Sequence, residues 1–167
     1  MSSTKRMYVL ALAKTLSQNS KFKEWKSKNQ NSYLVHFFKF GNQEWEIGYY
    51  NPNDTITSFV IKKNTIEIIP ETKIFKKNKR KLKKLELKKI KVDYEESIEI
   101  ATKFREKKYK NEKPVEIILI LQKLDIGQVY NITFLTQNFN TLNIKIDTET
   151  GKVIKDLLKP LISFKNG

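Results

Sequence analysis

The amino-acid sequence repeats its own pattern of apolar positions. Three pairs of segments match: 45–49 with 130–134, 57–61 with 142–146, and 10–16 with 98–104. The first two pairs lie 85 residues apart and the third lies 88 apart, a drift that one shorter loop in the second copy would produce. Self-similarity at a fixed spacing indicates a duplicated unit. The matched residues are apolar core positions, so the repeat predicts architecture and says little about chemistry.

The first copy is expected to begin with a long helix. Ser3 or Thr4 can cap it, and apolar residues recur every three or four positions to about Lys28. Strands should follow, separated by turns rich in Gly, Asn and Asp, and the last should end at Pro70. The predicted strands are 33–40, 44–50, 56–61 and 65–69.

The second copy is expected to begin with a helix that runs from Asp93 to about Lys108. Asp93 and Glu96 have the spacing of a capping box, with acidic groups at the positive end of the helix. Strands are predicted at 115–122, 128–136, 141–147 and 152–155. The tail 157–164 is apolar, and we expect it to dock on the body of the protein.

Two predicted strands are apolar on both of their faces. In 33–40 and in 115–121, both alternating sets of residues are mainly apolar, a pattern typical of strands that are covered on both sides. One face should meet the helix of the same unit. The other is expected to meet the second unit's sheet, the tail, or another subunit, which includes a homodimer.

The end of the second copy resembles a PepSY domain. That family has a strand that ends in a D-x-x-T-G-x-V-like turn, which Asp147, Thr150, Gly151 and Val153 fit here, and a preceding helix with a small Ala, which 95–101 fits. The first copy has Lys-Lys-Asn at 62–64 in place of the turn. The resemblance implies an α+β, cystatin-like fold and the binding or regulation of proteins or peptides, sometimes peptidases, rather than catalysis.

The repeat and the resemblance together predict a three-part chain. Residues 1–72 would form a first PepSY-like unit, 73–91 a basic linker, and 92–167 a second unit with the apolar tail. Each unit would be a helix packed on a three- to four-stranded antiparallel sheet.

The linker carries most of the protein's net positive charge. The formal net charge is +15, and residues 73–91 hold eleven basic side chains against the single acidic Glu86. A mobile segment of this kind suits a polyanion, and such binding would depend steeply on salt. The competing interpretation is a solvated linker whose lysines reflect biased codon usage, because 30 of the 33 basic residues are Lys and phosphate sites favour Arg. The candidate polyanion-binding residues are Lys73, Lys76, Lys77, Lys79, Arg80, Lys81, Lys83 and Lys84.

Leucine and isoleucine are spaced through the second half of this linker. Leu82, Leu85, Leu87 and Ile90 have a spacing that predicts docking of 82–90 on the body.

The sequence lacks the residues on which most catalytic sites depend. The chain has no Cys and one histidine, His36, so zinc sites and histidine acid–base pairs are excluded. No glycine-rich phosphate loop is present. Glu95, Glu96 and Glu99 are expected to form a helix start and a solvated face. We therefore expect no enzyme, no cofactor and no metal, and we interpret His36 as structural.

The aromatic residues divide into core and surface candidates. Trp45, Tyr49, Tyr130 and Phe134 recur at matching repeat positions, which predicts burial. Tyr50 and Phe139 fall outside that register, so they are the better candidates for surface platforms that stack on nucleic-acid bases.

Two functions of different classes come first, and a third, a carboxylate-based enzyme, ranks well below both. The first is a non-enzymatic PepSY-like protein that recognises a peptide or protein on a sheet face or edge. The second is a nucleic-acid-binding protein that uses 73–91. The longest apolar run near the start, 7–13, is far too short to span a membrane, and we expect a soluble, cytoplasmic protein.

Overall fold

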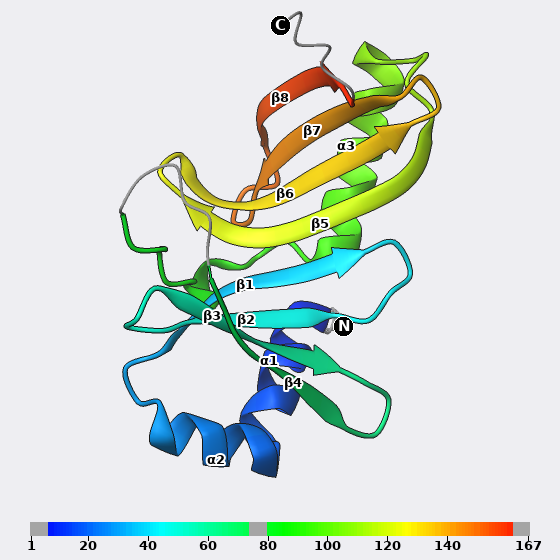
Figure 1. The fold of residues 1–167 in the computed structure, drawn as a ribbon. Coiled ribbons are helices and arrows are strands. Elements are labelled where there is room, and N and C mark those ends of the chain that lie inside the picture. The colour runs from blue at the N-terminus through cyan, green and yellow to red at the C-terminus, as the bar shows by residue number, and fades with distance from the viewer. Residues whose placement is uncertain (1–6, 74–79, 162–167) are drawn as a thin grey trace, which may run out of the picture.

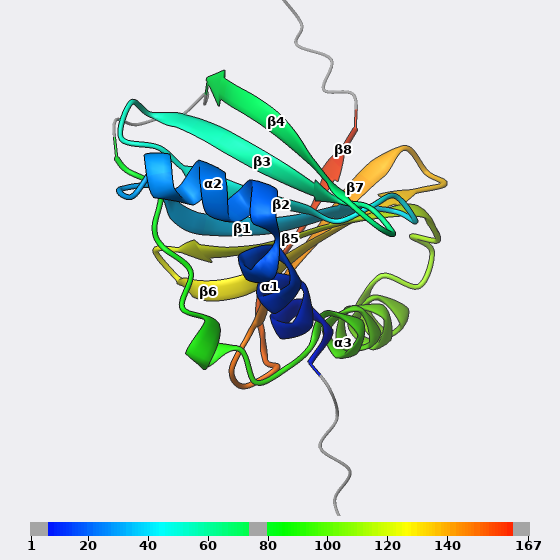
Figure 2. The same cartoon turned by 90° about the horizontal axis from the view of Figure 1, so that it is seen from below.

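The fold is α+β, with one antiparallel sheet and helices on one of its faces. The computed structural model describes residues 7–73 and 80–161. The sheet has eight strands in the order β4-β3-β2-β1-β5-β6-β7-β8. The three α-helices lie on the same side of it (Figures 1 and 2).

The described chain contains two successive groups of elements, each with helices followed by four strands. The elements are α1 (Tyr8–Gln18), α2 (Ser20–Lys28), β1 (Tyr33–Phe40), β2 (Glu46–Tyr50), β3 (Thr55–Ile61), β4 (Ile66–Lys73), the short 3-10 helix η1 (Leu87–Lys89), α3 (Tyr94–Lys108), β5 (Pro114–Leu124), β6 (Gly127–Thr136), β7 (Asn140–Asp147) and β8 (Val153–Pro160). None of the helices in this part of the chain is both long and apolar enough to span a lipid bilayer.

The predicted first helix is in fact two helices, and the break falls at Asn19. Its backbone is extended, and its side-chain oxygen accepts hydrogen bonds from the backbone N–H groups of Lys21 (2.9 Å) and Phe22 (3.2 Å). Asn is among the strongest helix N-cap residues, so α1 ends just before Asn19 and a new helix, α2, starts just after it. The predicted caps Ser3 and Thr4 lie outside the described residues.

The first turn of α1 is capped from the other half of the chain. The carboxylate of Asp93 accepts hydrogen bonds from the backbone N–H groups of Tyr8 (2.8 Å) and Val9 (3.3 Å). The predicted capping box at the start of α3 is therefore wrong, since the Asp93 side chain makes no cap bond to its own helix. One buried carboxylate instead ties the starts of α1 and α3 together.

Replacing Asp93 with alanine is expected to lower the free energy of unfolding by about 2 kcal/mol, because two helix N–H groups lose a charged acceptor. Asp93→Asn, which keeps one acceptor oxygen, should cost about half as much. Chemical denaturation measures the loss, and hydrogen exchange should place it at the amides of Tyr8 and Val9. Unchanged exchange at these amides in Asp93→Ala would contradict the capping role.

The predicted strands are largely confirmed, and the two edge strands differ most from prediction. β4 was predicted to end at Pro70 but continues to Lys73. Pro70 is tolerated because β4 is an edge strand, and its pairing with β3 shifts between Ile56 and Ser58. β8 is longer than predicted and includes the first residues of the apolar tail, which extend the sheet instead of docking on the body.

The two halves of the sheet join edge to edge at β1 and β5. Phe37 pairs with Leu121 across this seam, and both side chains are completely buried. A single apolar cluster extends under both halves on the helix side. The second apolar face of these strands was predicted to meet the second unit's sheet, the tail or another subunit. The first of these expectations is wrong, because the two halves form one continuous sheet, and residues 157–160 of the tail lie in edge strand β8. The second apolar face forms part of the open face of the sheet, where Phe38 and Ile120 are only partly buried.

The turn between β7 and β8 has the geometry that its sequence predicts. Asp147 Oδ1 accepts hydrogen bonds from the backbone N–H groups of Glu149 (2.9 Å) and Thr150 (2.7 Å), and Gly151 has a φ of 74°. Although burial raises it, these hydrogen bonds hold the pKa of Asp147 below its ordinary value.

Candidate functional site

The structure describes five of the eight predicted polyanion-binding residues, and they belong to two segments of the chain. Lys73 is the last residue of β4, and 80–84 form an irregular segment that leads to η1. Lys76, Lys77 and Lys79 lie outside the described residues.

Two of the predicted cations pair with a carboxylate of the protein itself. Asp125, in the turn between β5 and β6, lies 2.8 Å from Lys83 Nζ and 3.3 Å from Arg80 Nη1. The hydrogen bond from Lys83 holds the pKa of Asp125 below its usual value, and the charge of Arg80 adds to the effect. These groups are exposed, so the pairs add little stability, but they reduce the charge available to a polyanion.

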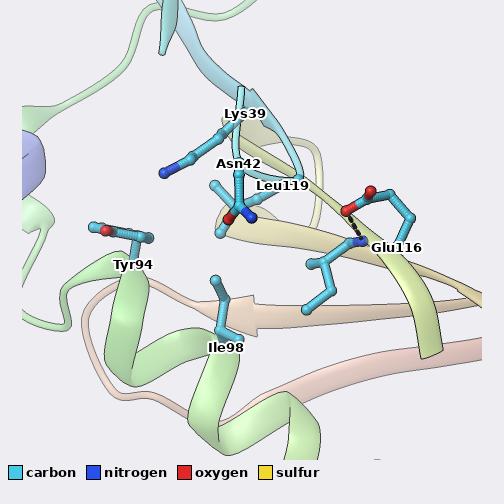
Figure 3. Close-up of a pocket in the computed structure, with 8 residues that line it drawn as sticks. Lys39, Asn42, Tyr94, Ile98, Glu116 and Leu119 are labelled. Atoms are coloured by element: carbon cyan, nitrogen blue, oxygen red, sulfur yellow. Dashed lines mark hydrogen bonds between the residues drawn. The ribbon is translucent and has the colours of Figure 1, made fainter. Parts of the chain in front are cut away.

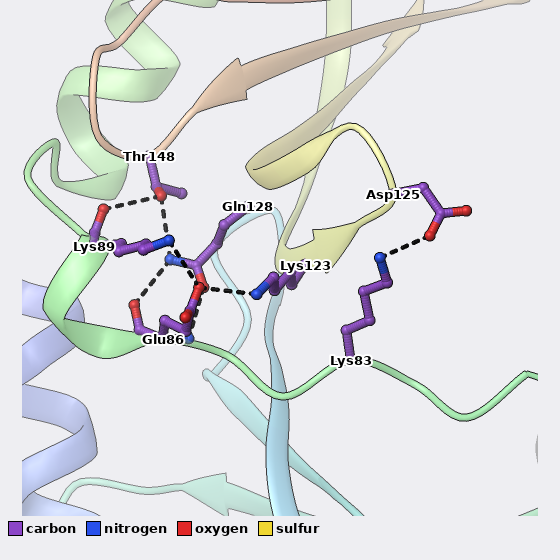
Figure 4. Close-up of polar contacts among 7 residues, drawn as sticks. All are labelled: Lys83, Glu86, Lys89, Lys123, Asp125, Gln128 and Thr148. Carbon is purple, nitrogen blue, oxygen red and sulfur yellow. Dashed lines mark hydrogen bonds and ion pairs between the residues drawn. The ribbon is translucent and has the colours of Figure 1, made fainter.

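The second half of the segment docks on the body, as its apolar spacing predicts. Leu85 is buried, and its N–H donates to Leu34 O at 3.0 Å. The Gln128 side chain bonds the backbone of Glu86 twice, accepting from its N–H (2.8 Å) and donating to its carbonyl (3.0 Å). Lys123 lies 2.9 Å from the Glu86 carboxylate (Figure 4). Residues 85–90 are therefore a packed strap on the protein surface.

Lys81 and Lys84 keep their charge unpaired within the described chain. Burial lowers the pKa of Lys26, and the nearby charge of Lys84 lowers it further. This mutual repulsion marks a local excess of positive charge beside α2.

A second candidate surface lies at the other end of the sheet, along edge strand β8. Its side chains leave 40% of Ile154, 42% of Leu157 and 36% of Leu158 exposed. The adjacent turn between β6 and β7 adds Phe139, which is 72% exposed and has a φ of 58°. Leu161 N–H donates to Phe139 O at 2.8 Å, which brings another exposed apolar residue to the same place. The register places Leu157 opposite Asn143 and Leu158 opposite buried Leu142, so these side chains lie on the two faces of the same edge. We call the five exposed apolar residues together the β8 surface.

The polar residues of β8 fix its position and leave a positive charge on its open side. Asp156 Oδ2 accepts hydrogen bonds from Lys108 Nζ (2.8 Å) and from the hydroxyl of Tyr109, both at the end of α3. These bonds, that from Lys108 first, lower the pKa of Asp156. Lys155 is paired in register with Lys145 of β7. Burial lowers the pKa of Lys145, and the charge of Lys155 adds to the shift.

The opposite edge, β4, differs from β8 in exposing no large apolar side chain. Both edges carry features that blunt strand addition, since β8 has Lys155, Lys159, a register shift beside Ile146 and a terminal Pro160. In β4, Pro70 interrupts the pattern of backbone donors. Its glutamates are occupied: Glu67 pairs with Lys62 at 2.6 Å, and Glu71 accepts a hydrogen bond from Asn53 at 2.9 Å.

The comparisons with known proteins show a fold and no family. No protein-family model matches the chain, and no curated protein matches it. The chain is similar to the crystal structure of a "putative lipoprotein (CD1622)" from Clostridium difficile 630. The TM-score is 0.54 with 19% identity, and the match covers 83% of this chain and 90% of that one. The likeness is in fold alone. The PepSY resemblance and the cytoplasmic location stay predictions.

The aromatic residues largely follow their predicted division. Trp45, Tyr130 and Phe134 are buried, and Phe139 is exposed as predicted. Tyr50 was predicted at the surface but is only 3% exposed, because its ring packs 5.4 Å from that of Tyr33 and its hydroxyl donates to Asp54.

Within residues 7–73 and 80–161, no three His, Asp or Glu side chains lie close enough together to hold a metal ion. His36 lies on the open face of the sheet, where burial lowers its pKa to about 4.

Proposed function

We propose that this protein is a non-enzymatic binding protein that adds an extended peptide segment to the edge of its sheet at β8. The observation that carries the proposal is an eight-residue edge strand whose apolar side chains remain exposed. An edge strand presents unpaired backbone N–H and C=O groups, and natural proteins usually cover or blunt such an edge. Addition of a strand would satisfy these groups, and the exposed side chains would supply specificity.

The charges beside β8 favour an acidic partner. Lys145 and Lys155 lie opposite each other, and Lys159 follows on the same strand. Like charges directly opposite are unfavourable, and a carboxylate on an added strand, next to Lys155, would offset the repulsion. A second copy of β8 would bring its own lysines to the edge. The expected partner is therefore a segment that alternates apolar residues with Asp or Glu.

Nucleic acid is a second candidate partner, supported by the positive charge around Lys26, Lys81 and Lys84. Its binding would release counterions and weaken steeply as salt rises. The pairing of Arg80 and Lys83 with Asp125 lessens this charge, so we rank the peptide above it.

Changing Ile154 and Leu157 together to Ser is expected to weaken binding of a fluorescein-labelled peptide of alternating Val and Glu by about tenfold or more. Both side chains are exposed, so the fold should be retained. The matched control changes Val115 and Ile126, which are 67% and 49% exposed but lie elsewhere, to Ser. Fluorescence anisotropy measures both, and the control should bind as the unaltered protein does.

Other occupants would give different results in the same experiment. Absence of peptide binding, or equal loss in the control, would overturn the proposal. A dimer detected by sedimentation would also overturn it if changing Ile154 and Leu157 to Ser dissociated that dimer, because β8 would then pair with a second copy of the protein. Tighter binding of single-stranded RNA than of the peptide would point to nucleic acid. The function would be assigned to nucleic acid if changing Lys81 and Lys84 to Gln abolished this RNA binding, while changing exposed Lys14 and Lys21 to Gln preserved it.

A further inference from the structure

A cavity lies on the helix side of the sheet, where α1 and α3 begin near the β1–β2 turn, and no residue of β8 lines it. It has two hollows that share Lys39. The larger, of about 720 Å³, lies between α1 and the β3–β4 turn. The smaller, of about 270 Å³, lies between the β1–β2 turn, α3 and β5 (Figure 3). None of the functions considered above uses this cavity.

Lys39 holds a positive charge over an aromatic floor. Its Nζ atom lies 5.5 Å from the ring centroid of Trp45 and 5.7 Å from that of Tyr94. The two rings meet edge to face at 5.0 Å, and Tyr8 packs against Tyr94 at 5.4 Å. Lys39 forms no ion pair with another residue of the described chain. Ring faces attract the ammonium group, but they leave its charge without a counter-ion.

Trp45 provides a second group that lacks a partner. It lines the larger hollow and is 4% exposed, and its indole Nε1–H has no hydrogen-bond acceptor among the described residues. A buried donor without an acceptor costs about 1–3 kcal/mol. This N–H is covered by protein atoms, so Trp45 offers a ligand in the hollow the exposed part of its ring and not the N–H.

The residues that line the larger hollow indicate which chemical groups a ligand there would carry. Tyr8, Leu12, Trp45 and Ile61 make part of the wall apolar. Three lysines, Lys39, Lys62 and Lys63, face one carboxylate, that of Glu44. Lys62 is already paired with Glu67, which leaves Lys39 and Lys63 to attract an anion.

We propose that this cavity binds a small organic anion, with an apolar or aromatic body against Trp45 and Tyr8 and its charged group at Lys39. Such sites combine a mainly apolar wall with a few placed polar groups that fix orientation. Carboxylates, sulfonates and phosphate esters share the required chemistry.

The first probe is anilinonaphthalene sulfonate, an aromatic anion whose fluorescence rises on binding. The protein carries Trp25→Phe, so that Trp45 is its sole tryptophan. One probe should bind per chain, with saturable quenching of Trp45 emission. Lys39→Met, which keeps the side-chain stem, should weaken binding by about tenfold, whereas Lys39→Arg should restore it. Lys23→Met, at an exposed position on α2, is the matched control and should change nothing.

Displacement of the probe by other compounds shows whether binding depends on the ligand's charge or on its apolar body. A variant of the β8 surface shows whether the probe binds in the cavity or at β8. Decanoate should displace the probe and decanol should not, while phenyl phosphate tests whether a phosphate ester is also accepted. Changing Ile154 and Leu157 to Ser should leave probe binding intact. Unchanged affinity in Lys39→Met, equal displacement by decanol, absence of saturable binding, or loss of binding in the Ile154 and Leu157 variant would each overturn the proposal.

Discussion

Replacing Phe37 with alanine is expected to lower the free energy of unfolding by about 4 kcal/mol. Phe37 is completely buried in β1, the strand that joins the two halves of the sheet. The truncation removes a large apolar side chain and leaves a cavity beside Leu121, its partner across the seam. Because one apolar cluster extends under both halves, both should lose stability together.

Two probes of denaturant unfolding test this expectation. Tryptophan emission reports on the first half of the chain, which holds both Trp25 and Trp45, and far-ultraviolet circular dichroism reports on the whole sheet. The two transitions should coincide before and after the substitution. Phe38→Ala, on the open face of the same strand, is the matched control and should cost about 1 kcal/mol. Equal losses in the two variants, or separate transitions for the two probes, would contradict a shared core.

Local patterns predicted the elements well. The strand 33–40 has the bounds that its apolar run indicated, and the Asp147 turn follows from residues that are close in sequence. Exposed Phe139 was also predicted, because it falls outside the repeated register. Each of these features depends on interactions over a few residues, which is the range that a sequence pattern reports.

Contacts between distant segments account for most of what the sequence did not predict, and the helix break at Asn19 is the exception. Asp93 has the spacing of a local cap, yet its carboxylate bonds to Tyr8, 85 residues away. The helix break at Asn19 is local, and its N-cap propensity was a signal that the apolar periodicity obscured. The edge-to-edge joining of β1 and β5 leaves open the face that was predicted to be covered.

The candidate sites were harder to predict than the fold for the same reason. The basic run of 73–91 is conspicuous in the sequence, but Asp125, which neutralises part of it, lies in a distant turn. Lys39, Trp45 and Tyr94 meet only because α3 packs beside the β1–β2 turn. The apolar character of the tail is visible in the sequence. Its exposure is not, because it follows from the position of β8 at the edge of the sheet.

His36 is held uncharged by its surroundings on the open face of the sheet. It lines a hollow of about 360 Å³ with Phe38, and Glu46 of β2 and Lys73 of β4 are the charged groups in the same hollow. The imidazole lies directly over Gly48, where a β-carbon would overlap it. Burial lowers the pKa of His36 to about 4, from an ordinary value of 6.5.

Acidification is therefore expected to destabilise the protein before its carboxylates titrate. Below pH 6.5 the unfolded chain gains a proton at His36 that the folded protein does not accept until about pH 4. Stability should fall across this range, by about 3 kcal/mol at pH 4, because each unit of pKa difference corresponds to about 1.4 kcal/mol. No other histidine contributes, since the chain has only one.

His36→Gln should remove this part of the pH dependence and leave the decline below about pH 4 that arises from carboxylates with lowered pKa, such as Asp147 and Asp156. Denaturant unfolding between pH 8 and 4 compares the two proteins, and the proton resonance of the imidazole gives the pKa directly. A midpoint near 6.5, or the same loss of stability in His36→Gln, would show that the imidazole accepts its proton in the folded protein without penalty.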